Sequence, residues 1–415
     1  MPAKAGRKKY LRYLDYLWIA MSVATFGYIV LNWYDIAWRT GAPTPLDIIM
    51  GLIAIVVSLE ATRRGMGWIL AVVIVVFMMY YFLGHYLPRE WGGHAPFNIR
   101  RIVSAVYLDT HLDGIFGTST YVMFKYVFLI YMFGKGLELT GATGYLIDLA
   151  RALVGTIRGG AAMIAVVASS FVGTITGLAT ANVLITGVVT IPLMKRTGFK
   201  AGAAGGVEAA ASSGGQLMPP IMGLATFLMM AFLAIPYFEI VKAAIFPAIL
   251  YYVGVGASIL FYSRGARVGA VPRSEVPKLK EVLKRREGIV FFAGFIALVY
   301  LIAQRYSPTL AALVALLVVF VLSYITPHKM TPSKLIDLFS DTTRDFLTLG
   351  AIMGGIGLII GTILSTGLAF RITQLLLDFT GGALAPTLIL VMIACIILGM
   401  GLPVMVIYIV AVILM

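Results

Sequence analysis

Apolar stretches of about 20 residues recur along this chain, and they restrict its fold more than any other feature. A helix of about that length is needed to cross the hydrocarbon core of a bilayer. The 415 residues are 60% hydrophobic and only 12% charged, with a mean hydropathy of +0.96, whereas a soluble domain is about a quarter charged. The sequence therefore predicts an all-α polytopic membrane protein.

Most of the apolar stretches have the length of a simple crossing, but two do not fit this description. The stretches 160–193 and 384–415 contain glycine-rich interruptions, and each is poorly described as one crossing. The predicted simple crossings lie near 13–33, 44–60, 67–86, 119–138, 202–235, 238–262, 288–304, 308–326 and 345–368.

The formal net charge of +14 could indicate nucleic-acid binding, so its distribution matters. With the N-terminus placed in the cytoplasm, the predicted inner segments hold 23 Lys and Arg residues and the predicted outer segments hold six. Positive residues concentrate on the cytoplasmic side of membrane proteins. The basic excess therefore indicates a topology in the cytoplasmic membrane, with 264–286 as a solvated inner connector, and no nucleic-acid partner is predicted.

This charge distribution holds only if both doubtful stretches return to the side from which they start. The first, 160–193, lies between the basic residues Arg158 and Lys195. If it crossed, every later loop would change sides, and the basic run 264–286 would face outward. We therefore predict two re-entrant helical hairpins, formed by 160–193 and by 384–415.

Two segments of the chain resemble each other at a constant offset of 226 residues. Each copy has a Thr-Gly pair, an amphipathic stretch, a glycine turn, an apolar arm and a glycine-containing break. The charge count places the copies in opposite orientations, which predicts an inverted repeat with substrate near the membrane midplane. The repeats are assigned to 119–262 and, incompletely, to 345–415. The matched positions are Thr140-Gly141 with Thr366-Gly367, Gly155 with Gly381, and Gly173 with Gly399.

Breaks in a membrane helix predict a polar site, because lipid satisfies no backbone N–H or C=O group. In the first break, hydroxyl, amide and freed carbonyl oxygens would suit Na⁺, and the N–H groups of the next half-helix would favour an anion. The alternative is that these side chains bond to their own helix and the glycines serve close packing. The candidate residues of this break are Ser169, Ser170, Gly173, Thr174, Thr176 and Asn182.

Two further breaks follow along the chain. Two glycines and two prolines between Ser212 and Pro220 end any regular helix, although a proline kink without a ligand is the alternative. Glu208, one helical turn before Ser212, could face a cation or lie at a membrane interface. The candidate residues are Ser212, Ser213, Gly214, Gly215, Gln216, Pro219 and Pro220 in the second break, and Gly399, Gly401 and Pro403 in the third.

Sequence motifs of enzymes and ATPases are missing from the chain. It has no His-Glu-x-x-His, no Gly-x-Ser-x-Gly and no Walker glycine loop followed by lysine. We therefore predict a secondary transporter without catalytic residues, and without a cofactor beyond Na⁺ as coupling ion. A membrane-embedded enzyme and a purely structural subunit are the alternatives from other classes.

Several segments resemble the fused permeases of tripartite ATP-independent periplasmic (TRAP) transporters, of the type paired with TAXI-class binding proteins. The run 208–222 is the most specific of them, and the resemblance extends from about residue 35 to the end of the chain. The other resembling segments are 39–47, 59–64, 113–117, 173–177 with 181–183, 191–195 and 398–403.

The resemblance implies a permease that imports organic acids (carboxylates) by symport with Na⁺, with an extracytoplasmic TAXI-type solute-binding protein as partner. It implies a membrane-anchoring region, 1–110, fused ahead of a transport region, 111–415, whose hairpins move in an elevator mechanism. Substrate would lie between hairpin tips at 173–176 and 399–403. The implied Na⁺ contacts are Ser170, Gly173, Asn182, Ser213 and Gly399.

The sequence departs from the pattern of this family at both ends. Its N-terminal region is shorter than usual, and it stops at Met415 within an apolar run. Members of the family continue through a second broken crossing with its own Pro-Pro pair, so we expect the chain to be truncated or completed by another chain. A carboxylate or ion carrier that works without a binding protein is the alternative within the same architecture.

Overall fold

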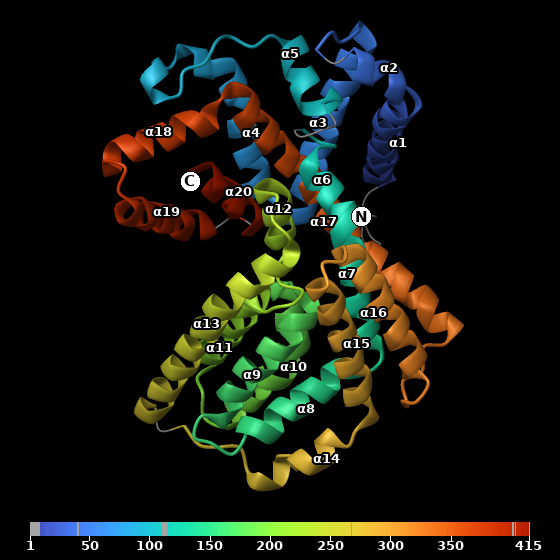
Figure 1. Ribbon diagram of the computed structural model, residues 1–415, viewed down its shortest axis with the longest axis vertical. Helices are drawn as coiled ribbons and strands as arrows, with labels where there is room; N and C mark the ends of the chain where they lie inside the picture. Colours follow the sequence, from blue (N-terminus) through green and yellow to red (C-terminus); the bar gives the residue numbers. More distant parts are fainter. Residues whose placement is uncertain are drawn as a thin grey trace. The chain divides into compact units, whose positions relative to one another are not determined.

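A computed structural model describes residues 9–39, 41–109, 114–266, 268–400, 402 and 404–414. Every regular element within these ranges is helical, and none of the described residues forms a strand (Figure 1). The all-α prediction is therefore confirmed. The chain divides into two compact units, one of residues 1–123 with 345–415 and the other of residues 124–344.

Six helices of the described part are long and apolar enough to cross a membrane by length and composition. Their large apolar side chains are widely exposed, as at Val23, Phe246 and Ile296, which suits a surface in contact with lipid. The chain is thus a multi-pass membrane protein. The six are α1 (Lys9–Leu31), α3 (Pro45–Met66), α4 (Trp68–Leu83, continued by a 3-10 turn to Tyr86), α13 (Tyr237–Gly265), α15 (Arg286–Ala303) and α17 (Pro332–Thr366).

Two of the predicted crossings are not single regular helices. The stretch 202–235 is interrupted where its glycines and prolines predict, whereas 119–138 contains a π-helical turn that the sequence analysis did not predict. The first stretch forms α11 (Ala201–Ser213), the 3-10 turn η5 (Gly214–Leu217) and α12 (Ala225–Leu233); the second forms α6 (Thr118–Val122), the π turn η4 (Met123–Val127) and α7 (Phe128–Leu139).

In the unit of residues 1–123 and 345–415, α17 lies close to α3 and to the turn at Gly114. A side chain at Gly357 would collide with the carbonyl of Gly114, so glycine is required for this approach. The hydroxyl of Thr62 lies 3.2 Å from the carbonyl oxygen of Ala351. The other helices of this unit are α2 (Trp33–Trp38), α5 (Ile99–Val103), α18 (Leu368–Thr380), α19 (Leu384–Gly399) and α20 (Val404–Leu414).

A buried carboxylate, Asp47, ties the start of α3 to α1 in the same unit. Thr44 and Asp47 form a capping box, in which the Thr44 amide donates to Asp47 Oδ2 at 2.7 Å. The Tyr28 hydroxyl and the Arg39 guanidinium donate to Asp47 Oδ1 at 2.6 and 3.0 Å. The resembling segment 39–47 is therefore a structural network that orients the chain entering α3.

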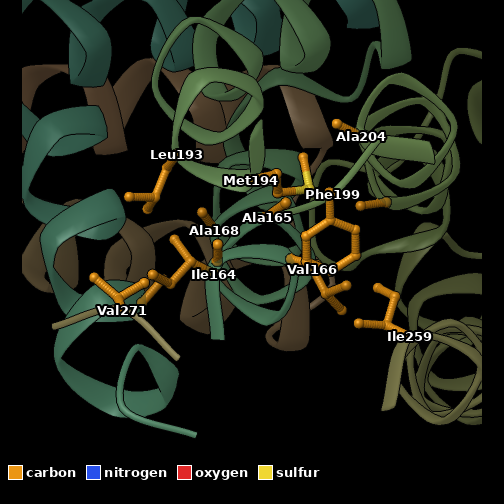
Figure 2. Packing of buried hydrophobic residues seen from close by; sticks show 14 of the residues in the cluster. Ile164, Ala165, Val166, Ala168, Leu193, Met194, Phe199, Ala204, Ile259 and Val271 are labelled. Carbon is orange, nitrogen blue, oxygen red and sulfur yellow. The ribbon is translucent and has the colours of Figure 1, made fainter. Parts of the chain in front are cut away.

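In the unit of residues 124–344, α9 (Gly160–Thr176) is enclosed by its neighbours. Its alanines, such as Ala165 and Ala168, are fully buried together with Ile164 and Met194, and Figure 2 shows these side chains packed together. Small side chains let helix backbones approach closely. The remaining helices of this unit are α8 (Ala142–Val154), α10 (Ala179–Arg196), α14 (Leu279–Leu283) and α16 (Pro308–Ser323).

The basic connector 264–286 is largely exposed, in keeping with the predicted solvated connector, but a few of its residues are anchored to the helices of this unit. Val268 and Val271 are each 3% exposed and belong to the core around α9. The amide of Val271 donates to the carbonyl of Gly155 at 3.2 Å. Arg285 forms an ion pair of 2.7 Å with Asp148 on α8. Isolated hydrophobic residues, together with ion pairs to α8 and α10, therefore determine where this segment lies.

The helices α8 and α18 correspond closely, as the internal repeat predicts. Each has 13 residues and begins after a glycine with a left-handed backbone, Gly141 (φ 82°) and Gly367 (φ 72°). Their bounds differ by the predicted offset of 226. Since only glycine adopts this conformation without strain, the paired glycines support a repeat; its inverted orientation in the membrane stays a prediction.

Candidate functional site

The predicted first hairpin is formed by α9 and α10, which run antiparallel beside each other (Figure 1). The chain reverses at Gly177 (φ 58°) and Leu178, just beyond the predicted tip at 173–176, which still belongs to the last turn of α9. A side chain at Gly177 would collide with the carbonyl of Met222. The turn thus occurs at the residue where both the backbone conformation and the space exclude other amino acids.

Polar groups join the two arms of the hairpin near its turn. The Asn182 side-chain amide donates to the Ser169 carbonyl at 2.9 Å, and the hydroxyls of Ser169 and Thr186 are 3.2 Å apart. All three residues are fully buried. The hairpin therefore encloses a polar seam within an otherwise apolar element.

The second predicted break lies at the expected residues and forms a closed loop. After α11 ends at Ser213, η5 follows, the Pro219-Pro220 bond is cis, and α12 begins at Ala225. The Gly223 amide donates to the Gln216 carbonyl at 2.8 Å and so closes this loop. At this break, backbone N–H and C=O groups are therefore left outside the hydrogen bonds of a continuous helix.

The hairpin and the broken crossing meet at two glycines. A side chain at Gly173 would collide with the backbone of Gly215, and a Cβ at Gly215 would lie 2.7 Å from Asn182 Nδ2. The hydroxyls of Ser169 and Ser212 are 3.4 Å apart. The structure therefore brings residues of the first two predicted breaks together around one buried polar cluster.

Glu208, whose role the sequence left open, lies at the centre of this cluster. Its side chain is fully buried. Thr186 donates to Oε1 and Thr190 donates to Oε2, while the Ser212 hydroxyl lies 3.1 Å from Oε1. Within the described part of the chain, no lysine or arginine forms an ion pair with it. Thr190 was missed as a candidate because it comes close to Glu208 only when α10 packs on α11.

One oxygen of the cluster has no hydrogen-bond partner among the described residues. This is Asn182 Oδ1, which is buried from solvent, and Thr176 Oγ1 near the hairpin turn is in the same condition. A buried polar atom without a partner is uncommon and needs a physical reason. Amide and carbonyl oxygens beside a helix break are ligands of Na⁺ in transporters, so the donor set fits a small cation.

Three other candidate oxygens bond to their own helices. Ser170 donates to the Val167 carbonyl at 2.8 Å, Thr174 to that of Phe171 at 2.6 Å, and Ser213 to that of Ala209 at 2.7 Å. This is the alternative role considered above for isolated serines and threonines. These residues stay predicted ion or substrate contacts.

The third break follows the end of α19 at Gly399, and α20 begins at Val404. Gly401 and Pro403 lie outside the described residues. Gly399 belongs to the unit of residues 1–123 and 345–415, whereas the first two breaks belong to the unit of residues 124–344. Its part in one common site stays a prediction.

A cavity of about 610 Å³ in the unit of residues 1–123 and 345–415 contains none of the predicted site residues. Asn98, Arg100 and Arg101 contribute to its lining. Both arginines lie on a predicted outer segment, and no feature of the sequence indicated this cavity.

Comparison with known proteins places these observations in context. Residues 53–415 match the family model described as "Tripartite ATP-independent periplasmic transporter, DctM component". A relative is the C4-dicarboxylate TRAP transporter large permease protein DctM of Pseudomonas aeruginosa, which is 27% identical over 205 residues, or 48% of this chain and 46% of that protein. The match spans about half the length of this curated relative. The resemblance seen in the sequence is confirmed at the level of this family.

Proposed function

This chain belongs to the DctM component family of tripartite ATP-independent periplasmic transporters, and we propose that it is the membrane permease of a carrier that imports organic acids. The family match covers residues 53–415, and six helices have the length and composition of membrane spans. The relative from Pseudomonas aeruginosa is named for C4-dicarboxylates. We propose the same substrate class for this chain.

The observation that carries the proposal is the buried oxygen cluster where the hairpin meets the broken crossing. The unpartnered Asn182 Oδ1 supplies an open ligand position, and the Ser169 carbonyl lies beside the same side chain. Gly173 and Gly215 keep this region free of further side chains. We propose Na⁺ as the co-transported ion bound at Asn182, with the substrate carboxylate near the hairpin turns.

The finer architecture belongs to the same proposal. The hairpins α9–α10 and α19–α20 would be re-entrant and would move in an elevator mechanism. Residues 1–110 would anchor this movement, with a cytoplasmic N-terminus. An extracytoplasmic TAXI-type solute-binding protein would deliver the substrate.

The test is uptake of radiolabelled succinate by the complete transporter in proteoliposomes, with and without its binding protein, over a series of Na⁺ concentrations. We expect Asn182→Ala to raise the Na⁺ concentration for half-maximal uptake by about tenfold, since losing one ligand oxygen costs roughly 1.4 kcal/mol. Ser258→Ala is the control, because Ser258 is exposed on α13 and its hydroxyl bonds to its own helix.

Uptake at an unchanged rate in the absence of Na⁺ would remove Na⁺ from the proposal. Uptake that needs no binding protein would favour the alternative of a carrier that works alone. Neither result would change the family to which the chain belongs.

A further inference from the structure

Glu208 is a buried carboxylate without a cationic partner among the described residues. Burying an ionised carboxylate is costly unless an opposite charge accompanies it. The neighbouring α9 carries no ionisable side chain. On α10, the ionisable residues are Lys195 and Arg196 at its C-terminal end, and Arg196 is paired with Glu275 at 2.8 Å. The surroundings of Glu208 therefore leave its charge uncompensated.

The facing helix α13 does not supply the missing charge either. Its Tyr251 and Tyr252 hydroxyls donate to the carbonyls of Ala210 and Ala211 at 2.7 and 3.2 Å, and so they hold α11 through its backbone. Lys242 of α13 is paired with Glu239 at 2.6 Å. Arg264 ends this helix next to the connector. Each element packed on α11 thus contributes apolar or neutral polar groups around the carboxylate.

Neighbouring residues of α10 and α11 place hydroxyl groups and free space around the Glu208 carboxylate. Thr186 and Thr190 are one helical turn apart on α10, so that their hydroxyls reach both carboxylate oxygens. Ser212 is one turn after Glu208 on α11 and reaches the same group. A Cβ at Gly187 would lie 3.2 Å from Glu208 Cγ, so glycine gives the acidic side chain its space. A defined pocket of neutral donors thus holds the carboxylate in one place.

A short chain of contacts links the carboxylate to Asn182, the residue that carries the open amide oxygen. The Thr186 hydroxyl, which contacts Glu208 Oε1, also lies 2.8 Å from the carbonyl oxygen of Asn182. The Asn182 side chain is in turn held on the Ser169 carbonyl, which leaves Oδ1 without a partner. Because these groups are buried from water, the charge of Glu208 acts more strongly on an ion at Asn182 than it would across solvent.

We propose that Glu208 is a specificity-determining residue, which supplies the buried negative charge that makes the neighbouring oxygen site select a monovalent cation. The inference rests on the proposed ion site at Asn182, but it names a residue outside that ligand set. Without the ion, the uncompensated carboxylate destabilises the hairpin and the broken crossing. The bound ion offsets this destabilisation through its electrostatic attraction to the carboxylate.

The test is the thermal unfolding of the purified full-length chain in detergent, with NaCl replaced by choline chloride at constant ionic strength. We expect Na⁺ to raise the Tm of the wild type. Glu208→Gln keeps the shape of the side chain and removes its charge. In choline it should unfold at a higher temperature than the wild type, and its Na⁺ affinity should be about tenfold or more weaker.

A structural role alone makes the opposite prediction. Glu208→Gln would then be less stable than the wild type in both salts, with an unchanged Na⁺ affinity, and this result would overturn the inference. Glu208→Asp keeps the charge and should retain the Na⁺-dependent rise in Tm; loss of that rise in a folded Glu208→Asp protein would also overturn it. This variant keeps the test decisive should the glutamine variant fail to fold.

The failure of this inference can be distinguished from the failure of the proposed function. A wild type whose Tm does not respond to Na⁺ contradicts the proposed ion site itself. A wild type that responds, an Asn182→Ala variant that does not, and a Glu208→Gln variant that responds like the wild type would contradict only the role of Glu208. Ser258→Ala serves as the unaffected control in each salt.

Discussion

Buried polar side chains of this protein fall into two kinds, which Asp47 and Asn182 represent. Asp47 has partners for both carboxylate oxygens, from Tyr28, Arg39 and Thr44. Asn182 leaves its Oδ1 without a partner among the described residues. At Asp47 the paired arginine and the complete hydrogen bonding indicate a structural role, whereas at Asn182 the open oxygen beside a helix break indicates a place for a ligand.

This difference predicts opposite effects for substitutions at Asp47 and at the ion site. Asp47→Ala removes the capping box of α3 and leaves Arg39 without its carboxylate, which should lower the free energy of unfolding by about 3 kcal/mol. The Na⁺ affinity of the folded protein should not change. Unfolding in mixed micelles measures the first quantity, and Asp35→Asn is the control because Asp35 is exposed. A lowered Na⁺ affinity with normal stability would contradict this assignment.

A second prediction concerns the contact between Gly173 and Gly215. Gly173→Ala places a methyl group against the Gly215 backbone, and such overpacking costs about 1–3 kcal/mol. Because the strain separates the hairpin from the broken crossing, Na⁺ binding should weaken about tenfold. Gly144→Ala on α8 is the matched control: a Cβ there meets no atom within 4 Å, and alanine favours the helix. Equal Na⁺ affinities for both variants would exclude this contact from the site.

At the level of elements, the hairpin and the connector are each positioned by a small number of residues. The turn of the hairpin follows from one glycine, and the enclosure of α9 follows from its row of buried alanines. The connector is held by the buried Val268, Val271 and Val282, by its ion pairs with Asp148 and Arg196 at 2.7 and 2.8 Å, and by the Arg151 guanidinium, which donates to the Glu275 carbonyl at 2.8 Å. Such partly exposed pairs contribute little to global stability.

The connector should therefore respond locally to the loss of Asp148. Asp148→Ala should speed tryptic cleavage within 264–286, while the Tm of the whole protein changes little, because exposed pairs are worth about 0–1 kcal/mol. Limited proteolysis followed by mass spectrometry measures the effect. Glu281→Ala is the control, since its pair with Lys278 is largely exposed. Unchanged cleavage would mean that the ion pair between Asp148 and Arg285 does not contribute to holding the connector.

At the level of the whole molecule, the distribution of charge predicts the orientation in the membrane. The residues on either side of the hairpin α9–α10 and the connector carry most of the inner positive charge. If the hairpin returns to the side from which it starts, Lys195 and Arg264 both face the cytoplasm.

Labelling of single cysteines tests this orientation directly. The chain has one cysteine, Cys395, so Cys395→Ser provides a background for Lys195→Cys and Arg264→Cys. We expect both to react with an impermeant maleimide only in inside-out vesicles, and Arg305→Cys, on a predicted outer segment, only in right-side-out vesicles. Labelling of Lys195→Cys and Arg264→Cys from outside would mean that the hairpin crosses the membrane.

Much of the helical architecture could be predicted from the sequence, because the signals involved are local. Six of the nine predicted crossings overlap a described helix of the length and composition of a membrane span, and the glycines and prolines of 212–220 predicted the interruption that separates α11 from α12. Left-handed glycines mark the starts of α8 and α18 at the expected offset. Backbone conformation and hydrophobic length depend on neighbouring residues alone.

Other features depend on which helix faces meet, and only the tertiary structure decides them. The sequence did not indicate that Thr186 and Thr190 would enclose Glu208, or that Val268 and Val271 would join the core around α9. Each depends on the rotation of one helix about its axis relative to another. Hydrophobic composition alone does not set this rotation, whereas the close packing of glycines and alanines between the helices contributes to it.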